Sequence, residues 1–429
     1  MLNKSKATQI YDSFCSFLII IFPAALITGP VVPEFIMFFL SFFFLFENFK
    51  YNNFKFKNLF LYFVIAFQFV IFLSIFNTSI QEVKVLKNIF YFRYFIFALS
   101  ISYFIKKDIS INKKILFVFF IIYLLFIFDS IFQFLLDVNI LGFELYKPNN
   151  LTRVSSFFGD ELVMGSFFSR LFPLVLSLIF ITYDIEKNNN AFYFSFLILV
   201  ATIILILFSG ERVAFFNFIF FIFLFVLYDF NNKTKKKLLY FIILLCCLFL
   251  FSFKNFSERI IFSSYQQIFK TYSVDEREYL PSFKYFSDQH HAHAVTALKI
   301  FKDNIFIGSG PQSFRYLCSD KKYQIDKGCA THPHSTYLQI LSELGVFGFL
   351  LLSALFLYLL SKLSKIIINS YKLKANSKSY SCVCILILFI LNLWPIVPSG
   401  NFFNNWMSMI YYFPLGFFLS NNFKMFKEY

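Results

Sequence analysis

Twelve apolar segments of about 15–24 residues divide the chain, and a helix needs roughly 20 residues to cross the hydrocarbon core of a membrane. We expect spans at 14–28, 31–46, 58–76, 88–105, 115–136, 165–183, 191–208, 213–228, 238–253, 337–360, 380–397 and 402–420. Of the 429 residues, 59% are hydrophobic and 15% are charged, whereas a soluble domain carries about 25% charge. The sequence therefore predicts an all-α integral membrane protein, folded as a single polytopic domain over residues 1–429.

Basic residues are spread unevenly over the connections between these segments. The even-numbered connections and the two ends of the chain hold 21 lysines, whereas the short odd-numbered connections hold five basic residues. Because cytoplasmic loops are enriched in lysine and arginine, both termini are expected in the cytoplasm. The two large connections, 137–164 and 254–336, then lie outside the cytoplasm as a cap over the spans. The net charge of +15 does not indicate nucleic-acid binding, because no basic stripe lies on a soluble domain.

Two of the seven cysteines, Cys318 and Cys329, lie in the 254–336 loop. An oxidising compartment favours a structural disulfide between them, and the alternative is a pair of free thiols. The other cysteines lie in apolar segments and are interpreted as small buried hydrophobic residues.

Three arginines fall at the outer ends of predicted spans. Arg212 ends the short connection 209–212, Arg153 precedes the sixth span, and Arg170 lies just inside that span. Arginine close to hydrocarbon is costly, and its planar guanidinium group suits bidentate contacts to phosphate. We interpret the three as candidate phosphate ligands; the alternative is that each snorkels to lipid headgroups or a helix-end carbonyl.

A fourth arginine, Arg93, lies in the middle of the predicted span 88–105. We expect it to form a structural ion pair with a carboxylate such as Asp129 or Glu343, because an unpaired charge inside a membrane is expensive.

His334 lies just before the tenth predicted span. Thr336 and Gln339 have the spacing of a capping box, so a helix is expected to begin there. The N-terminus of a helix attracts anions and disfavours the imidazolium form of a nearby histidine. A neutral imidazole is the form that a general base needs. The sequence therefore predicts a base beside an anion site, which suits chemistry on a lipid-linked phosphate.

All five histidines, His290, His291, His293, His332 and His334, fall in the long loop. His332 and His334 flank a proline in a segment expected to be extended, so their rings should point to opposite sides. The spacing does not match a zinc site, and no metal is expected. His332 is a candidate substrate contact, whereas the first three histidines are interpreted as loop contacts. No ATP-binding motif or complete dinucleotide fingerprint is present, and no cofactor is expected.

Three motifs together resemble the O-antigen ligase / Wzy-type polymerase superfamily of bacterial envelope glycan enzymes. They are Ser209-Gly210-Glu211-Arg212 after a span, Gly308-Ser309-Gly310-Pro311-Gln312-Ser313-Phe314 in the long loop, and His334 spaced before Leu338, Glu343, Gly345 and Gly348. Their order covers roughly residues 150–360. Glu211 departs from the pattern, because small or neutral residues are commoner at that position in the family.

The resemblance implies a membrane glycosyltransferase of GT-C-like architecture, metal-independent and inverting, in the bacterial inner membrane. It implies transfer of a glycan from undecaprenyl diphosphate to a sugar hydroxyl on the periplasmic face, the acceptor being lipid A–core in a ligase. By motif match, His334 and Arg212 are the catalytic residues. Arg153, Arg170 and His332 are expected to contact the substrate, and Glu343 to orient an arginine or the histidine beside it.

Three alternatives remain open from the sequence. A polymerase would use a second lipid-linked repeat unit as acceptor, and acceptor choice lies in loop shape. A transporter or flippase of lipid-linked glycans would also need many spans, but its ionisable residues would lie near the membrane midplane. A structural membrane scaffold would not need clustered external histidine and arginine.

Overall fold

The computed structural model describes residues 6–51, 59–78, 80–83, 86–147, 152–183, 190–228, 287–370 and 376–420, together with Glu258 and Tyr265. Over these residues the chain is helical, and the β-structure is limited to two isolated bridges, Val138–Glu144 and Tyr146–Arg153. The α-helices are α1 (Lys6–Ala25), α2 (Val31–Tyr51), α3 (Leu59–Asn77), α4 (Leu86–Ile89), α5 (Arg93–Lys107), α6 (Ile111–Leu136), α7 (Met164–Thr182), α8 (Asn190–Ser209), α9 (Arg212–Tyr228), α13 (Asp288–Asp303), α14 (Phe314–Leu317), α15 (Thr336–Ser370), α16 (Ser377–Asn392) and α17 (Asn405–Leu419). Short 3-10 turns lie at η1 (Leu26–Thr28), η2 (Gln81–Val83) and η4 (Ser156–Phe158).

Seven of the described helices are long and apolar enough to cross a membrane: α1, α2, α3, α6, α7, α8 and α15. Two shorter helices, α9 and α16, are also apolar. Large aromatic side chains such as Phe35, Phe38 and Phe76 are exposed on these helices, as expected for surfaces that face lipid rather than water. The all-α membrane class is therefore confirmed, whereas the number of twelve spans stays a prediction.

Most helices follow the predicted spans within a few residues, but α1 begins eight residues earlier and α15 ends ten residues later than expected. Two further differences change the connections between helices. The expected span 88–105 is divided into α4 and α5 by a turn at 90–92, so its helical part begins only at Arg93. The connection between α16 and α17 was expected to cover 398–401 but runs from 393 to 404. Pro395 and Pro398 lie within it and explain its length, because proline lacks the N–H that a continuing helix would donate. The predicted span 238–253 lies outside the described residues.

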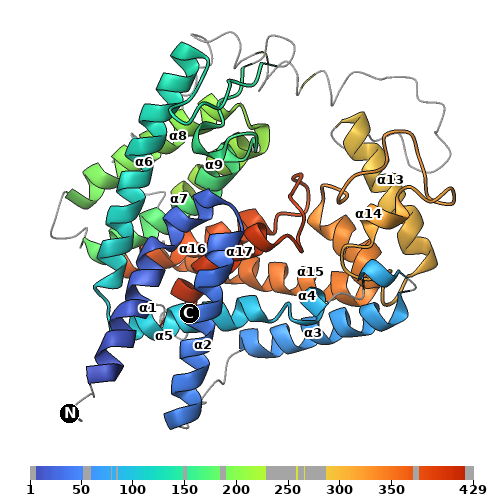
Figure 1. The fold of residues 1–429 in the computed structure, drawn as a ribbon, viewed down its shortest axis with the longest axis horizontal. Coiled ribbons are helices and arrows are strands. Elements are labelled where there is room, and N and C mark those ends of the chain that lie inside the picture. Colours follow the sequence, from blue (N-terminus) through green and yellow to red (C-terminus); the bar gives the residue numbers. More distant parts are fainter. Residues whose placement is uncertain are drawn as a thin grey trace.

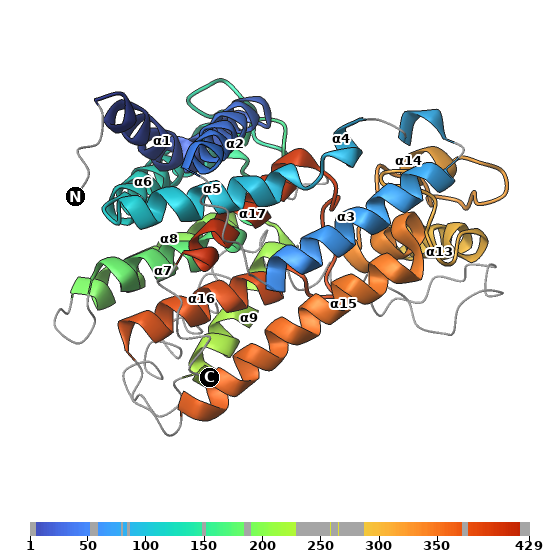
Figure 2. The same ribbon diagram turned by 90° about the horizontal axis from the view of Figure 1, so that it is seen from below.

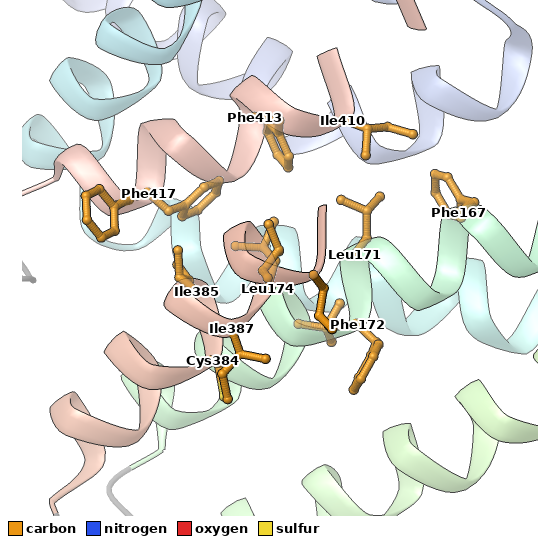
Figure 3. Close-up of a cluster of buried hydrophobic side chains, with 14 of the residues drawn as sticks. Phe167, Leu171, Phe172, Leu174, Cys384, Ile385, Ile387, Ile410, Phe413 and Phe417 are labelled. Atoms are coloured by element: carbon orange, nitrogen blue, oxygen red, sulfur yellow. The ribbon is translucent and has the colours of Figure 1, made fainter. Parts of the chain in front are cut away.

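Helix α7 is the centre of the bundle, and nearly all of its side chains are buried. It packs against α8, α9, α16 and α17. Figure 3 shows Leu171 and Leu174 of α7 meeting Ile385 of α16 and Phe413 of α17 in this core. Its buried polar side chains bond to α16, because Arg170 donates to Asn392 and the hydroxyls of Ser177 and Ser381 lie 2.6 Å apart. Polar groups inside a membrane favour contact with protein over contact with lipid, which fits this central position.

Helices α3 and α15 lie side by side and lead to the loop region (Figures 1 and 2). α13 and α14 sit at the end of this pair, against the first turns of α15. The described part of the long loop, 287–336, is therefore packed on the helix bundle rather than set apart from it.

Arg93 does not have the position or the partners that the sequence led us to expect. It is the first residue of α5, and its guanidinium NH2 lies 2.8 Å from the Tyr94 hydroxyl and 3.9 Å from a carboxylate oxygen of Glu34. The expected partners are engaged elsewhere: Asp129 accepts from Ser156 and from the N–H of Ile140, and Glu343 lies in α15. The expected ion pair with a carboxylate is present, but its partner is Glu34 rather than Asp129 or Glu343, because the break between α4 and α5 moves Arg93 to a helix end.

Candidate active site

The described part of the long loop is hydrogen-bonded to the backbone of α15 at a break in that helix. Gly345 has a φ of 66° and a ψ of −166°, which interrupts the helix and leaves backbone groups without helical partners. The loop satisfies them: the N–H of Gly310 donates to the Glu343 carbonyl at 2.9 Å, and the N–H of Val346 donates to the Ile305 carbonyl at 2.8 Å. Unsatisfied backbone groups are not tolerated in lipid, so the break in α15 depends on the hydrogen bonds that the loop supplies.

Gly308 and Gly345 allow the backbone of the loop to approach the backbone of α15 closely. A Cβ on Gly345 would lie 2.4 Å from the Phe306 backbone, and one on Gly308 would lie 2.3 Å from the Glu343 backbone. Both residues also have positive φ values, which other residues rarely adopt. Gly308 and Gly345 therefore allow the close contact between the loop and α15.

Helix α15 begins at Thr336, close to the expected residue, but its cap differs. The Ser335 hydroxyl accepts from the N–H of Leu338 at 3.4 Å, so Ser335 takes the capping position. Thr336 instead donates to the Ser399 hydroxyl at 2.7 Å, and the Gln339 side chain bonds Glu343 and Asn401. The predicted Thr336–Gln339 capping box was wrong, because the helix begins one residue earlier than that box requires.

His334 is half-buried immediately before this cap, in a left-handed conformation with a φ of 52°. Its carbonyl oxygen accepts a 3.0 Å hydrogen bond from the backbone N–H of Ser399. The turn brings the His334 ring to 4.1 Å from that of His332, measured between centroids. The expectation of rings on opposite sides was wrong, because it assumed an extended backbone through His334.

Helix α13 adds two further imidazoles to this pair. Ser287 caps the helix, and its hydroxyl lies 2.6 Å from Nδ1 of His290. The rings of His290 and His293 are 5.4 and 5.2 Å from the ring of His334. The expectation that His290 and His293 are loop contacts did not include this grouping with His334. The i, i+3 spacing behind a serine cap was the available signal, because it places both rings on one helix face.

The four histidines, His290, His293, His332 and His334, form what we call the imidazole cluster, and burial keeps it neutral. Desolvation lowers the pKa of His334 from its ordinary value of 6.5. Burial, with the charge of His334 as the second cause, lowers the pKa of His290 and of His293 to about 4 and that of His332 to about 3. At neutral pH the ring of His334 is therefore unprotonated and able to accept a proton.

His332 is anchored by the loop between α16 and α17. Its Nε2 lies 3.2 Å from the Ser399 carbonyl oxygen, and its Nδ1 lies 3.0 Å from the Thr331 hydroxyl. Both ring nitrogens thus have partners in the protein, which fixes the ring beside His334. This arrangement fits a residue that positions its neighbour.

The predicted arginines Arg153 and Arg212 meet at the turn between α8 and α9. Arg153 donates through Nε to the Ser209 carbonyl at 3.1 Å and through NH2 to the Leu162 carbonyl at 3.2 Å. Gly210 makes the turn with a φ of 61°, and Arg212 begins α9. The charges of the two arginines act on each other, so they form one positively charged region.

This region reaches the imidazole cluster, because the charge of Arg212 is one of the causes that lower the pKa of His290. Arg212 thus acts electrostatically on His290, one member of the imidazole cluster, and Arg153 acts on Arg212. A cationic turn beside a neutral imidazole can stabilise a developing phosphate charge while a proton is removed nearby.

Glu211, the departure from the family pattern, is half-buried in this turn. Its Oε2 accepts from the Ser166 hydroxyl at 2.7 Å and from the Ser166 N–H at 3.2 Å. Burial raises the pKa of Glu211, and the Ser166 hydroxyl and then the charge of Arg153 oppose that rise. Glu211 therefore joins the turn to the start of α7.

Glu343 is fully buried, and its carboxylate is bonded by the protein itself. Oε2 accepts from the N–H of Gln312 at 2.8 Å and from the Gln339 amide at 3.1 Å, and Oε1 accepts from the N–H of Phe314 at 3.3 Å. These bonds fasten the 308–314 motif to α15. Glu343 therefore fixes the loop to α15. The positive charge of Arg315 also acts on the Glu343 carboxylate.

Arg315, in α14, is a cation that sequence reasoning did not single out. Its charge is one of the causes that lower the pKa of His332, and its Nε is buried without a hydrogen-bond partner. It follows the 308–314 motif directly, which was the signal available in the sequence. Three residues further on, Cys318 is joined to Cys329 in a disulfide with a Cα–Cα distance of 4.9 Å, which closes the loop that follows α14.

Arg170 lies apart from this group. It is 6% exposed within α7, and its NH1 donates to the Asn392 side chain at 2.7 Å. Its guanidinium carbon is 5.8 Å from the centre of the Tyr411 ring. The structure therefore places Arg170 in the interior of the bundle, between α16 and α17.

Within the described part of the chain, no group of three histidine, cysteine or acidic side chains has a geometry that could hold a metal ion.

Comparison with known proteins agrees with the resemblance seen in the motifs. A family model described as O-antigen ligase matches residues 197–353, which span α8, α9, α13, α14 and the first half of α15. The match contains Arg212, the imidazole cluster and the disulfide. The predicted resemblance to the O-antigen ligase / Wzy-type superfamily is confirmed over this segment. No curated protein matches the chain.

Proposed function

We propose that this chain, whose residues 197–353 match the O-antigen ligase family, is a glycosyltransferase of the bacterial inner membrane. It moves a glycan from undecaprenyl diphosphate to a sugar hydroxyl on the periplasmic face. The observation that carries the proposal is the neutral, half-buried ring of His334, set among three further imidazoles, of which His290 lies within the field of Arg212. The rest of the assignment follows from the chemistry that His334 and Arg212 can perform together.

The reaction is a single displacement at the anomeric carbon of the donor sugar. His334 accepts the proton of the acceptor hydroxyl, and the oxygen forms a new bond to the anomeric carbon as the bond to the diphosphate oxygen breaks. The electron pair leaves with the diphosphate, whose added charge Arg212 offsets. One displacement inverts the configuration at that carbon. A positioned base of this kind is typically worth about 10²–10⁴-fold in rate.

The neighbouring residues support these two roles. Arg153 binds the carbonyls of Ser209 and Leu162 and so fixes the turn that carries Arg212. Ser399 binds the backbone carbonyl of His334, and the ring of His332, which is itself bonded to Ser399, lies against the ring of His334. Glu343 fastens the motif loop that leads to Arg315. These are positioning roles, because each acts through another residue.

The test is reconstitution with a lipid-linked glycan and two separate acceptors, lipid A–core and a second lipid-linked repeat unit. Transfer to lipid A–core is the expected result. Product formed only on the lipid-linked unit would instead identify a polymerase with the same chemistry. If neither acceptor receives glycan from a folded protein with a suitable donor, the proposed transfer is wrong.

A further inference from the structure

The connection between α6 and α7 is fastened by two buried side chains near the end of α6. Gln133 donates to the carbonyl of Phe143 at 3.2 Å and accepts from the N–H of Ser156 at 2.8 Å. Asp129 accepts from the N–H of Ile140 at 2.9 Å and from the hydroxyl of Ser156. Each side chain is fully buried and bonds both described segments of the connection, 137–147 and 152–163. The two segments are therefore held in one arrangement, and a ligand between them would meet a preformed surface.

An open pocket of about 710 Å³ lies between these two segments. Small-molecule sites in proteins have volumes of about 300–1,000 Å³, so its size suits a small ligand or the end of a larger one. Its lining is 142–147 on one side and Ser155, Gly159, Asp160 and Leu162 on the other. The pocket thus lies wholly in the connection that the sequence predicts to be outside the cytoplasm.

Two aromatic rings in the lining are open to the pocket. Phe143 is 37% exposed and Tyr146 is 49% exposed. A Cβ on Gly159 would lie 2.9 Å from the Phe143 ring, so that ring lies directly against the Gly159 backbone and its position is fixed. Unlike the exposed aromatic residues of the membrane helices, these two share their pocket with charged side chains, which face water. Open aromatic rings of this kind suit stacking against the C–H face of a sugar.

The same pocket contains two carboxylates, Glu144 and Asp160. Both side chains are exposed, and neither has a hydrogen-bond or ion-pair partner among the described residues. Lys147 also lines the pocket, but it is paired with Asp137. Free carboxylates accept from hydroxyl and ammonium groups and repel other anions. The pocket therefore suits a neutral or amino sugar and disfavours a phosphate or an acidic sugar.

The pocket is joined through Arg153 to the turn that begins α9. The backbone N–H of Arg153 donates to the Tyr146 carbonyl at 2.9 Å, and its NH2 donates to the Leu162 carbonyl at 3.2 Å. Its Nε donates to the carbonyl of Ser209, three residues before Arg212. Two residues of the pocket wall are therefore bonded to the arginine that fixes the turn assigned above to the donor diphosphate.

We propose that this pocket binds a neutral or amino sugar of a glycan, with a sugar ring stacked on Phe143 or Tyr146. The sugar hydroxyl or ammonium groups donate to Glu144 and Asp160. Sugar binding as such does not depend on the reaction. That the sugar belongs to the glycan donor or to the acceptor rests on the proposed function.

The first test measures binding by saturation-transfer NMR to the full-length protein in nanodiscs, with three probes: cellobiose, the glucosamine disaccharide and digalacturonate. We expect the neutral and the amino disaccharide to bind and digalacturonate not to bind. Tyr146→Leu should raise the dissociation constant by about 3–10-fold, whereas Tyr146→Phe, which keeps the ring, should not. Tyr316→Leu is the matched control, because Tyr316 is a similarly exposed tyrosine (43%) that does not line the pocket. The double variant Glu144→Gln/Asp160→Asn should admit digalacturonate.

The second test follows glycan transfer by Tyr146→Leu with each substrate varied in turn. We expect a higher KM for one substrate with kcat unchanged, and the substrate affected is the one that carries the sugar. The proposal fails if neither the neutral nor the amino disaccharide binds, if digalacturonate binds as tightly as they do, or if Tyr146→Leu and Tyr316→Leu weaken binding equally. Unchanged KM values for both substrates would refute a role in transfer. Transfer without disaccharide binding leaves the proposed function intact, whereas disaccharide binding without transfer leaves the pocket assignment intact and contradicts the proposed function.

Discussion

The backbone N–H of Ser399 donates a 3.0 Å hydrogen bond to the carbonyl oxygen of His334, across 65 positions of sequence. The same residue accepts from Nε2 of His332 at its carbonyl and from Thr336 at its hydroxyl. The proposed base is therefore held by the connection between α16 and α17. This bond makes the left-handed backbone of His334 part of a tertiary contact rather than a local feature of the loop.

Ser399→Pro removes the N–H that binds His334, and Ser399→Ala keeps it while removing the hydroxyl. We expect the proline variant to lower kcat for glycan transfer by about 10–100-fold, because small displacements of a catalytic group are costly. The alanine variant should stay close to the native rate. The check is steady-state kinetics in liposomes; equal losses in the two variants would contradict a role for the N–H.

The pH dependence of transfer should show an acid limb. Because burial lowers the pKa of His334, the ring stays neutral at pH 7 and the rate should be on its plateau there. The rate should fall only as the pH drops well below 6.5, where the ring becomes protonated. A limb centred above pH 6.5 in the kcat/KM profile would show that His334 is not the titrating base.

Stability should also depend on the imidazole cluster. The folded pKa of His290 and of His293 is about 4 and that of His332 about 3, below the unfolded value of 6.5. Between these values the unfolded chain binds more protons, so the free energy of unfolding falls as the pH decreases from about 6.5 towards 3–4. Replacing all three with glutamine should flatten the dependence of melting temperature on pH over that window. An unchanged slope would contradict this account.

Gly345→Ala should destabilise the protein. The position combines a φ of 66° with a Cβ contact of 2.4 Å to the Phe306 backbone, and strain of this kind costs about 1–3 kcal/mol. Gly400→Ala is the matched control, because its Cβ would meet nothing nearer than 3.5 Å and its φ is not in the left-handed region. Thermal unfolding of the two variants is the measurement. A Gly345 variant as stable as the Gly400 variant would show that the break in α15 is not constrained.

Reduction should loosen the loop between Cys318 and Cys329, whose positions are 11 residues apart. In the chain-entropy model, a loop of that size contributes about 3 kcal/mol. The double variant Cys318→Ser/Cys329→Ser should melt lower than the native protein and should not respond further to a reducing agent. A native protein that melts identically with and without reductant would contradict a structural disulfide.

Much of the bundle could be predicted from the sequence because hydrophobic length determines where helices lie in a membrane. The limits of most spans, the turn at Arg212 and the start of α15 near His334 followed from local patterns. Errors arose where a single backbone angle or a tertiary contact decided the outcome. The left-handed φ of His334 turned two rings together, and the break before α5 moved Arg93 to a helix end.

The parts that were missed depend on contacts between distant segments. Nothing near His334 in sequence indicates Ser399, whose connection was expected to be four residues long. His290 and His293 became neighbours of His334 only because α13 packs on α15. Pro395 and Pro398, and the serine cap before α13, were local signals that could have improved the prediction. None of these local signals indicates which helices pack against each other.

The central claim concerns His334 and can be tested through the rate of glycan transfer by reconstituted His334→Ala. His334→Asn is the companion variant, because asparagine tolerates the left-handed backbone and cannot act as the base. We expect both variants to lose about 10²–10⁴-fold in rate. Both should keep the native melting temperature and membrane abundance. Transfer at the native rate by either variant would contradict the assignment of His334 as the general base.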